Sequence, residues 1–249
     1  MDGPDSISTR RALLASVGTV VAGGGVVYAG SQLGSDPTGR SSSRDRPPFH
    51  ASSESTGFGI DLSGHPIMGS TDASLEMYYW SDYQCPFCQR FETNTLPKLV
   101  DTHVATGTVR VVFIQFPYLS TGSLTAAVMD RCVWRQLRGE TPRRYLAWHS
   151  AVFDEQGEQG SGWAAEDNLL EVTREVDGVD AAAVESCLQR DRAGIESSIS
   201  ADVDRARRLD IGATPAFIIY DPATDRAVKL VGAQPSERFD TAIAELRNA

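Results

Sequence analysis

Lysine is nearly absent from this chain of 249 residues. Lys98 and Lys229 are the only lysines among the 23 basic side chains, the rest being arginine. The chain has 33 acidic side chains, and its formal net charge is −10. No basic patch that could follow a phosphate backbone is present, which argues against a nucleic-acid partner. An acidic, lysine-poor surface stays soluble in concentrated salt, so a halophilic source is one interpretation. A high-GC codon bias, which favours arginine over lysine, is the alternative.

Cysteine is also scarce, with four in the whole chain. Cys85 and Cys88 lie three positions apart, whereas Cys132 and Cys187 stand alone. The unequal spacing, and the lack of a histidine at ligand distance from either pair, argue against a metal site built from all four. Apolar residues, at 41% of the chain, are numerous enough to bury a core, which excludes wholesale disorder.

The first 30 residues carry the pattern of a targeting segment. Arg10 and Arg11 precede an uncharged, glycine-rich run over residues 12–30, and this pattern resembles twin-arginine translocation signals. The run is close to the roughly 20 residues that span a bilayer, so a cleaved signal and a membrane anchor both remain open. No cysteine lies near its end, which excludes lipid anchoring through a cysteine. We expect export, with the protein secreted or tethered to the outer face of the membrane.

The remaining chain divides into a predicted linker at 31–57 and a predicted domain at 58–249. Ser, Asp, Gly, Pro and Arg dominate the linker, which lacks apolar periodicity. In the domain, apolar spacing predicts a strand–helix–parallel strand unit, then a long helical stretch and a final hairpin. The expected strands cover 60–69 (with a turn), 75–80, 109–116, 211–220 and 227–231. The expected helices cover 85–107 (kinked at Pro97), 124–137, 145–153, 168–176, 181–210 and a closing segment around 239–246.

Cys85-Pro86-Phe87-Cys88 is the segment around which this arrangement is organised. It follows the buried strand predicted at 75–80 and begins the next helix. Unpaired helix N–H groups and the positive end of the helix dipole stabilise a thiolate at that position. Pro86 suits the first helical turn, where no N–H is needed. Cys88 lies one turn further on and can reach Cys85, which predicts a thiol–disulfide exchange site.

These residues resemble the thioredoxin superfamily, in its DsbA-like branch with a helical insertion. The matching segments are Ser81 to Cys88 after a strand, Phe116-Pro117 before the helical stretch, and Gly212 to Phe217 after it. The resemblance implies an α/β thioredoxin fold with an inserted α-helical subdomain at about 119–210. It also implies a cis Pro215 against the disulfide, with the Thr214 backbone free to pair with an extended substrate.

The resemblance implies roles for the motif residues as well. Cys85 is expected to be exposed and to form the mixed disulfide, Cys88 to be more buried and to resolve it, and Pro86 and Phe87 to tune the redox poise. Two positions depart from the strongly oxidising family pattern: Phe87 replaces a histidine, and Tyr79 replaces an acidic residue. Asp82 or Glu76 are the candidates to replace the missing carboxylate. Asp82 is equally well explained as a cap of the loop before the helix.

Other residues have two interpretations each. Cys132 and Cys187 are either a structural disulfide, which export favours, or two buried thiols that pack as small apolar side chains. His149 lies on the apolar face of its predicted helix, so packing is the favoured role. Trp134, Trp148 and Trp163 are interpreted as core or lid residues, and Trp80 is expected to pack beneath the site.

The sequence thus predicts an exported thiol–disulfide oxidoreductase, most simply a net dithiol oxidase, although a reductase or isomerase uses the same site. It needs no cofactor beyond its own redox-active disulfide, and no metal. Its expected partners are substrate proteins with thiols or disulfides and a membrane redox partner that reoxidises it. A protein of another class, which delivers copper(I) on Cys85 and Cys88, is the alternative. No methionine or histidine lies close to the pair to favour it.

Overall fold

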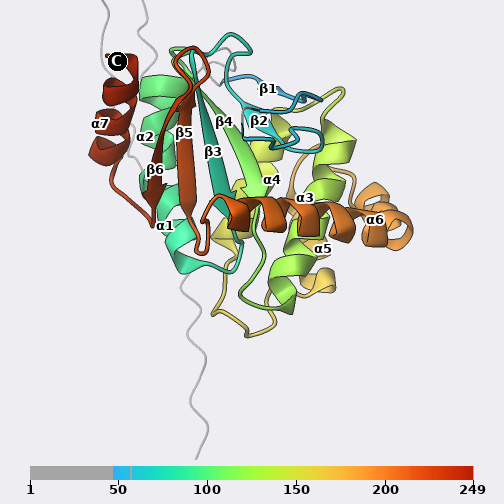
Figure 1. Cartoon of the computed structure of the whole chain (residues 1–249). Coiled ribbons are helices and arrows are strands. Elements are labelled where there is room, and N and C mark those ends of the chain that lie inside the picture. The colour runs from blue at the N-terminus through green and yellow to red at the C-terminus, as the bar shows by residue number, and fades with distance from the viewer. Residues whose placement is uncertain (1–46, 57, 249) are drawn as a thin grey trace, which may run out of the picture. The chain divides into compact units, whose positions relative to one another are not determined.

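The computed structural model describes residues 47–56 and 58–248, which form a six-stranded sheet with helices on both sides (Figure 1). The strand order is β1-β2-β4-β3-β5-β6. The central strands are β3 (Leu75–Ser81) and β4 (Val109–Gln115), and they pair in parallel. Every residue of β3 is buried, as expected for a strand covered on both faces. The predicted strand–helix–strand unit is therefore confirmed.

The connection between β3 and β4 is a helix with two interruptions. It consists of α1 (Pro86–Asn94), α2 (Leu96–Leu99) and a π-helical turn, η1 (Val100–Val104). The break falls at Thr95, two residues before the expected kink at Pro97, because proline supplies no N–H to the preceding turn. The segment ends at Gly107, whose φ of 76° is a left-handed conformation that glycine adopts without steric cost.

The helical insertion between β4 and β5 has the four helices that the sequence predicts. They are α3 (Thr121–Leu137), α4 (Arg144–Asp154), α5 (Glu166–Glu175) and α6 (Ala181–Arg208). Trp134 and Trp148 lie fully in the core, and Trp163 packs against it. A disulfide joins Cys132 of α3 to Cys187 of α6. Figure 1 shows this insertion gathered on one side of the sheet, with α1, α2 and α7 (Ser236–Arg247) on the other.

The chain returns to the sheet through the predicted hairpin. Strand β5 (Ala216–Asp221) pairs antiparallel with both β3 and β6 (Arg226–Val231). The pairing of Trp80 with Ala216 brings the start of β5 beside the end of β3. Because Cys85 follows β3 and Pro215 precedes β5, two segments far apart in the sequence meet at one end of the sheet.

The predicted linker at 31–57 extends too far, because part of it forms a strand at the opposite edge of the sheet. Residues Phe49–His50 form strand β1, which pairs with β2 (Ile67–Met68), and β2 pairs in turn with β4. The Phe49 ring is buried and lies 6.0 Å from the Phe113 ring and 5.7 Å from the Tyr145 ring, between centroids. One aromatic residue in a polar segment gives no periodic signal, so the sequence places the start of the fold too late. The predicted targeting segment at 1–30 lies outside the described residues.

Candidate active site

Cys85 occupies the N-cap of α1, at the end of a tight turn from β3. The Cys85 N–H donates to the Asp82 carbonyl at 2.9 Å, and the Cys85 carbonyl accepts from the N–H groups of Cys88 at 3.0 Å and Gln89 at 3.2 Å. Pro86 is the first residue of the helix, as its fixed φ favours. Both cysteines are free thiols in this structure. The sulfur of Cys85 therefore lies where the first-turn N–H groups of α1 have no helical partner.

The surroundings of the two thiols shift their pKa values in opposite directions. Contact with the Cys88 thiol lowers the pKa of Cys85 to about 6, against the opposing effect of burial and with help from Thr214 and from the Cys88 and Phe87 N–H groups. Burial, together with the hydrogen bond to Cys85, raises the pKa of Cys88 well above its ordinary value. The first cysteine is thus the thiolate of the reduced pair, and the second holds the proton.

The cis peptide bond between Thr214 and Pro215 lies against this pair. The Cys85 sulfur lies 3.3 Å from the Thr214 carbonyl oxygen. The Thr214 backbone therefore lies beside the sulfur that a substrate attacks, and its pairing with an extended substrate chain stays a prediction. Only 3% of Cys85 is accessible, which corrects the expectation of an exposed sulfur, although Cys88 is still more buried at 0%.

Asp82 ties two loops together beneath the site. It is 1% exposed, and its carboxylate accepts from the N–H groups of Gln84 at 2.9 Å, Tyr118 at 3.1 Å and Leu119 at 3.4 Å. Burial raises the pKa of Asp82. These contacts join the turn before Cys85 to the loop before α3, so the capping interpretation accounts for this residue.

Replacing Asp82 by alanine is expected to lower the free energy of unfolding by about 1–3 kcal/mol, because the three N–H groups lose their acceptor. Urea denaturation followed by circular dichroism measures this loss. Asp72→Ala, on an exposed turn, is the matched control and should change stability by less than about 0.5 kcal/mol. Equal effects of the two substitutions would contradict the role assigned to Asp82.

Glu76, the other candidate for the missing carboxylate, lies at the far end of β3. It binds the Arg110 guanidinium and accepts from the Tyr78 hydroxyl. The β3 register places it opposite Tyr220, whereas Trp80, next to the active-site turn, is opposite Ala216. Glu76 is thus too far along the strand to serve the cysteines, and this expectation is wrong.

The sequence analysis missed a clamp between the insertion and the active-site turn. The Gln156 side chain, just after α4, donates to the carbonyls of Tyr83 and of Cys85, the latter at 3.2 Å. The Gly160 N–H donates to the Gln84 side chain at 2.9 Å. A glutamine in a polar, glycine-rich segment carries no local signal, because its partners lie more than 70 positions earlier in the sequence.

A buried polar network behind the helix was also missed. His149 of α4 is fully buried, as the packing interpretation requires, but its Nε2 lies 2.9 Å from the Glu92 carboxylate of α1. Its Nδ1 lies 2.6 Å from the Tyr83 hydroxyl, which donates to Asp130 at 2.6 Å. The Tyr145 hydroxyl donates to the same Asp130 oxygen at 2.7 Å. The only local signal for this network is that Glu92 follows Cys88 by four positions, and so shares its face of the helix.

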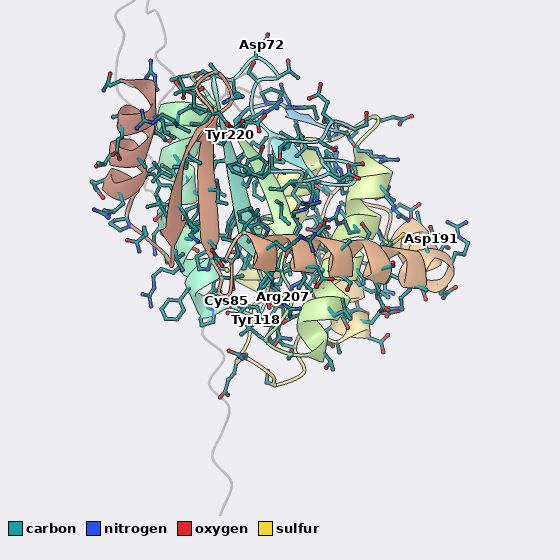
Figure 2. All side chains as sticks on the ribbon, in the orientation of Figure 1. Asp72, Cys85, Tyr118, Asp191, Arg207 and Tyr220 are labelled. Atoms are coloured by element: carbon teal, nitrogen blue, oxygen red, sulfur yellow. A yellow bond between two sulfur atoms is a disulfide. The ribbon has the colours of Figure 1, made fainter. Side chains whose placement is uncertain are left out.

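Two aromatic rings are exposed around the buried sulfurs. Phe87 is 51% exposed and lies under the Arg90 guanidinium, 5.2 Å from the ring centroid. Tyr118 is 43% exposed and lies at the same end of the sheet as Cys85 (Figure 2). Apolar side chains that face solvent at this end, next to a reactive sulfur, suit the binding of an unfolded protein segment.

The ionisation of Cys85 gives a direct test of this geometry. With a pKa of about 6, the thiol is mostly thiolate at pH 7, and the alkylation rate should fall about tenfold per pH unit below the pKa. Iodoacetamide labelling of the reduced protein between pH 4 and 9, with mass spectrometry of the Cys85 peptide, measures the profile. A midpoint near the ordinary cysteine value of about 8.5 would contradict the assigned environment.

Two thiols at a helix start beside a cis proline, on a sheet of this order, define the class of thiol–disulfide exchange proteins with a thioredoxin fold. The family model described as thioredoxin matches residues 62–243. The chain belongs to the thioredoxin family, in its DsbA-like branch, and is a thiol–disulfide oxidoreductase.

Individual relatives agree with this assignment. The chain is similar to disulfide bond formation protein D of Bacillus subtilis, with 24% identity over 160 residues that cover 64% of this chain and 69% of that protein. It is also similar in structure to a thioredoxin-like oxidoreductase from Silicibacter pomeroyi (TM-score 0.58, 26% identity, 75% of this chain and 94% of that one). DsbA2 of Pseudomonas aeruginosa is similar to the same degree (TM-score 0.58, 25% identity, 72% and 92%).

Proposed function

We propose that this protein is an exported dithiol oxidase that works through a mixed disulfide at Cys85. A thiolate of the substrate protein attacks the Cys85 sulfur of the Cys85–Cys88 disulfide, and Cys88 leaves as a thiolate and takes up a proton. A second substrate thiolate then attacks the substrate sulfur of the mixed disulfide, and Cys85 leaves as a thiolate. The substrate loses two electrons and gains a disulfide, while the enzyme becomes a dithiol.

The observation that carries the proposal is the opposed shift of the two thiol pKa values. Because the pKa of Cys85 is lowered to about 6, this sulfur is the better leaving group when the second substrate thiolate attacks. Stabilising a thiolate in the reduced form also makes the disulfide more oxidising. The same value lies above the roughly 3.5 of the strongly oxidising DsbA, so we expect a milder oxidant. A milder oxidant also agrees with Phe87, which replaces the histidine of the strongly oxidising family pattern.

Substrate proteins are expected to dock on the exposed rings of Phe87 and Tyr118. Phe87 follows Cys85 by two positions in α1, and Tyr118 lies at the same end of the sheet (Figure 2). Unfolded chains expose the apolar side chains that such a surface binds. A partner must accept the two electrons from the reduced pair for a second turnover, and a redox protein of the membrane is the proposed acceptor. The site is expected to need no cofactor beyond its own disulfide.

Export rests on the Arg10-Arg11 pair and the glycine-rich run after it. Among the described residues, no helix has both the length and the apolar character needed to cross a bilayer. Fusion of residues 1–57 to a reporter that is active only outside the cytoplasm tests the address, with Arg10→Lys/Arg11→Lys as the variant that should remain inside. Equal export of both fusions would contradict twin-arginine targeting.

The oxidase activity is tested with the oxidised full chain and reduced, unfolded ribonuclease A. We expect ribonuclease disulfides to form at the expense of Cys85–Cys88, with one disulfide made per enzyme in the absence of a reoxidant. Equilibration with glutathione buffers measures the reduction potential, and a value below that of glutathione would reverse the net direction. A copper(I) competition titration runs beside it: tight copper binding without ribonuclease oxidation would favour the delivery protein instead.

A further inference from the structure

The mechanism leaves one proton without an assigned route. Cys88 is 0% exposed, so water does not reach its sulfur. When reduced enzyme is reoxidised, Cys88 must lose its proton before it attacks the mixed disulfide at Cys85. When a substrate is oxidised, the Cys88 thiolate must regain that proton. A buried group next to Cys88 is needed to exchange it.

The carboxylates considered from the sequence do not provide this group. Asp82 directs its side-chain oxygens to three backbone N–H groups, and Glu76 is bound to Arg110 and Tyr78. Neither side chain is free to accept a proton from Cys88.

Glu92 lies on the same face of α1 as Cys88. The two are four positions apart, so their side chains are neighbours along the helix. Phe91, between them on this inner face, is fully buried, and its ring lies 4.9 Å from the Tyr79 ring of β3. The Glu92 side chain is only 6% exposed. The inner face of α1 therefore places a thiol and a carboxylate on either side of the point where Tyr79 packs.

Tyr79 carries a buried hydroxyl that lacks a hydrogen-bond partner within the described residues. Its ring is fixed by stacking on Phe217 at 5.0 Å between centroids, so the hydroxyl is held in place beneath α1. Ser81, two positions along on the same face of β3, has a buried hydroxyl that is likewise unpaired in the described structure. Burial is the largest factor that raises the pKa of Tyr79, followed by the charges of Glu92 and then Cys88. A buried hydroxyl left unpaired costs stability, so it calls for an explanation.

We infer that Tyr79 and Glu92 form the proton path of Cys88, an inference that rests on the proposed exchange at Cys85. In reoxidation the Cys88 thiol gives its proton to the Tyr79 oxygen while the Tyr79 proton passes to the Glu92 carboxylate. The net change is one proton moved from sulfur to carboxylate, and the thiolate formed attacks Cys85. Substrate oxidation runs the same transfer backwards. The unpaired Tyr79 hydroxyl is explained as a relay that bonds one neighbour or the other as the proton moves.

His149 is a positioning residue for this path. Its Nε2 contact of 2.9 Å holds the Glu92 carboxylate, and its other nitrogen is held by Tyr83. The ionisable groups that face the path are therefore Cys88 and Glu92 of α1, Tyr79 of β3, and His149 and Tyr145 of α4. Tyr83 and Asp130 complete the network behind them.

The test separates the two steps of reoxidation in the full-length reduced protein. Oxidised glutathione is added between pH 5 and 10, the reaction is quenched with acid, and mass spectrometry follows the glutathione adduct at Cys85 and its conversion to Cys85–Cys88. In Tyr79→Phe and Glu92→Gln, we expect adduct formation within about twofold of the natural protein. Conversion should slow at least about tenfold throughout this pH range, because hydroxide does not reach the buried Cys88 thiol and cannot replace the path.

Tyr78→Phe is the matched control, since it removes a buried hydroxyl from the adjacent residue of the same strand, and it should leave both steps unchanged. Conversion at the natural rate and pH profile in Tyr79→Phe and Glu92→Gln, or an equal loss in Tyr78→Phe, overturns the inference. Should Glu92→Gln fail to fold, Tyr79→Phe decides, because it removes one oxygen and leaves the Glu92–His149 contact intact. Failure of the proposed function is distinct: the natural protein then forms no adduct at Cys85.

Discussion

Cys85→Ser is expected to abolish the oxidation of reduced ribonuclease A, with a residual rate no higher than the uncatalysed one. Serine cannot form a disulfide, and Cys85 supplies the sulfur at the N-cap of α1, 3.3 Å from the Thr214 carbonyl oxygen. The remaining thiol, Cys88, is fully buried, and burial raises its pKa, so it does not replace Cys85 as a nucleophile. The appearance of native ribonuclease activity over time, under a glutathione buffer, measures the rate.

Cys88→Ser is the companion variant and should fail in a different way. It keeps the low-pKa sulfur, so it should still react with disulfides but remain as a mixed disulfide, because the resolving thiol is gone. We expect catalytic turnover to be lost while the covalent adduct accumulates. Turnover in either variant at more than about a tenth of the natural rate would contradict exchange by this pair.

The second large effect is on stability and involves the other two cysteines. The Cys132–Cys187 disulfide joins α3 to α6 across a sequence separation of 55 residues, and both side chains are buried. Restricting a loop of that length in the unfolded chain stabilises the folded protein by about 4 kcal/mol in the chain-entropy model. Cys132→Ala/Cys187→Ala should therefore lower the free energy of unfolding by about 3–4 kcal/mol. Guanidinium denaturation without reductant measures the difference.

The control for this measurement is Cys85→Ala/Cys88→Ala. The active-site pair closes a loop with only two intervening residues, so its removal restricts the unfolded chain far less. We expect its midpoint to lie well above that of the Cys132→Ala/Cys187→Ala variant. A loss below about 1 kcal/mol for the latter, or two buried free thiols by alkylation of the unfolded oxidised protein, would contradict the structural role of this disulfide.

The parts of the molecule that could be predicted from the sequence depend on local patterns. Seven consecutive buried residues in β3, the proline after Cys85, and helical spacing through the insertion each leave a signal within a few positions. The placement of Pro215 beside Cys85 depends on a distant contact, that of Cys85 with Thr214, 129 positions apart. It could be predicted only from the family resemblance of the Thr-Pro pair.

The parts that could not be predicted depend on contacts between residues that are far apart in the sequence and leave no local pattern. Glu92 and His149 meet across 57 positions, and each alone is explained equally well as a surface acid or a packed histidine. The expectation that Glu76 serves the cysteines is wrong because Glu76 lies near the start of β3, whereas the cysteines follow its end. Its carboxylate is bound to Arg110, which is 34 positions away in the sequence. The predicted start of the domain at residue 58 was too late, because the two residues of β1 are too few to show a periodic pattern.

Trapping the mixed disulfide tests the central claim most directly. Oxidised full-length protein is mixed with a large excess of reduced, unfolded ribonuclease A in which all but one cysteine are alkylated, so that no second substrate thiol can release the complex. The reaction is quenched with acid at successive times, before Cys88 attacks Cys85 and releases the substrate. Peptide mass spectrometry then locates the bond. We predict one covalent complex, joined through Cys85. A bond at Cys88 or at Cys132 or Cys187, or the absence of any complex, would contradict exchange at the first cysteine of the motif.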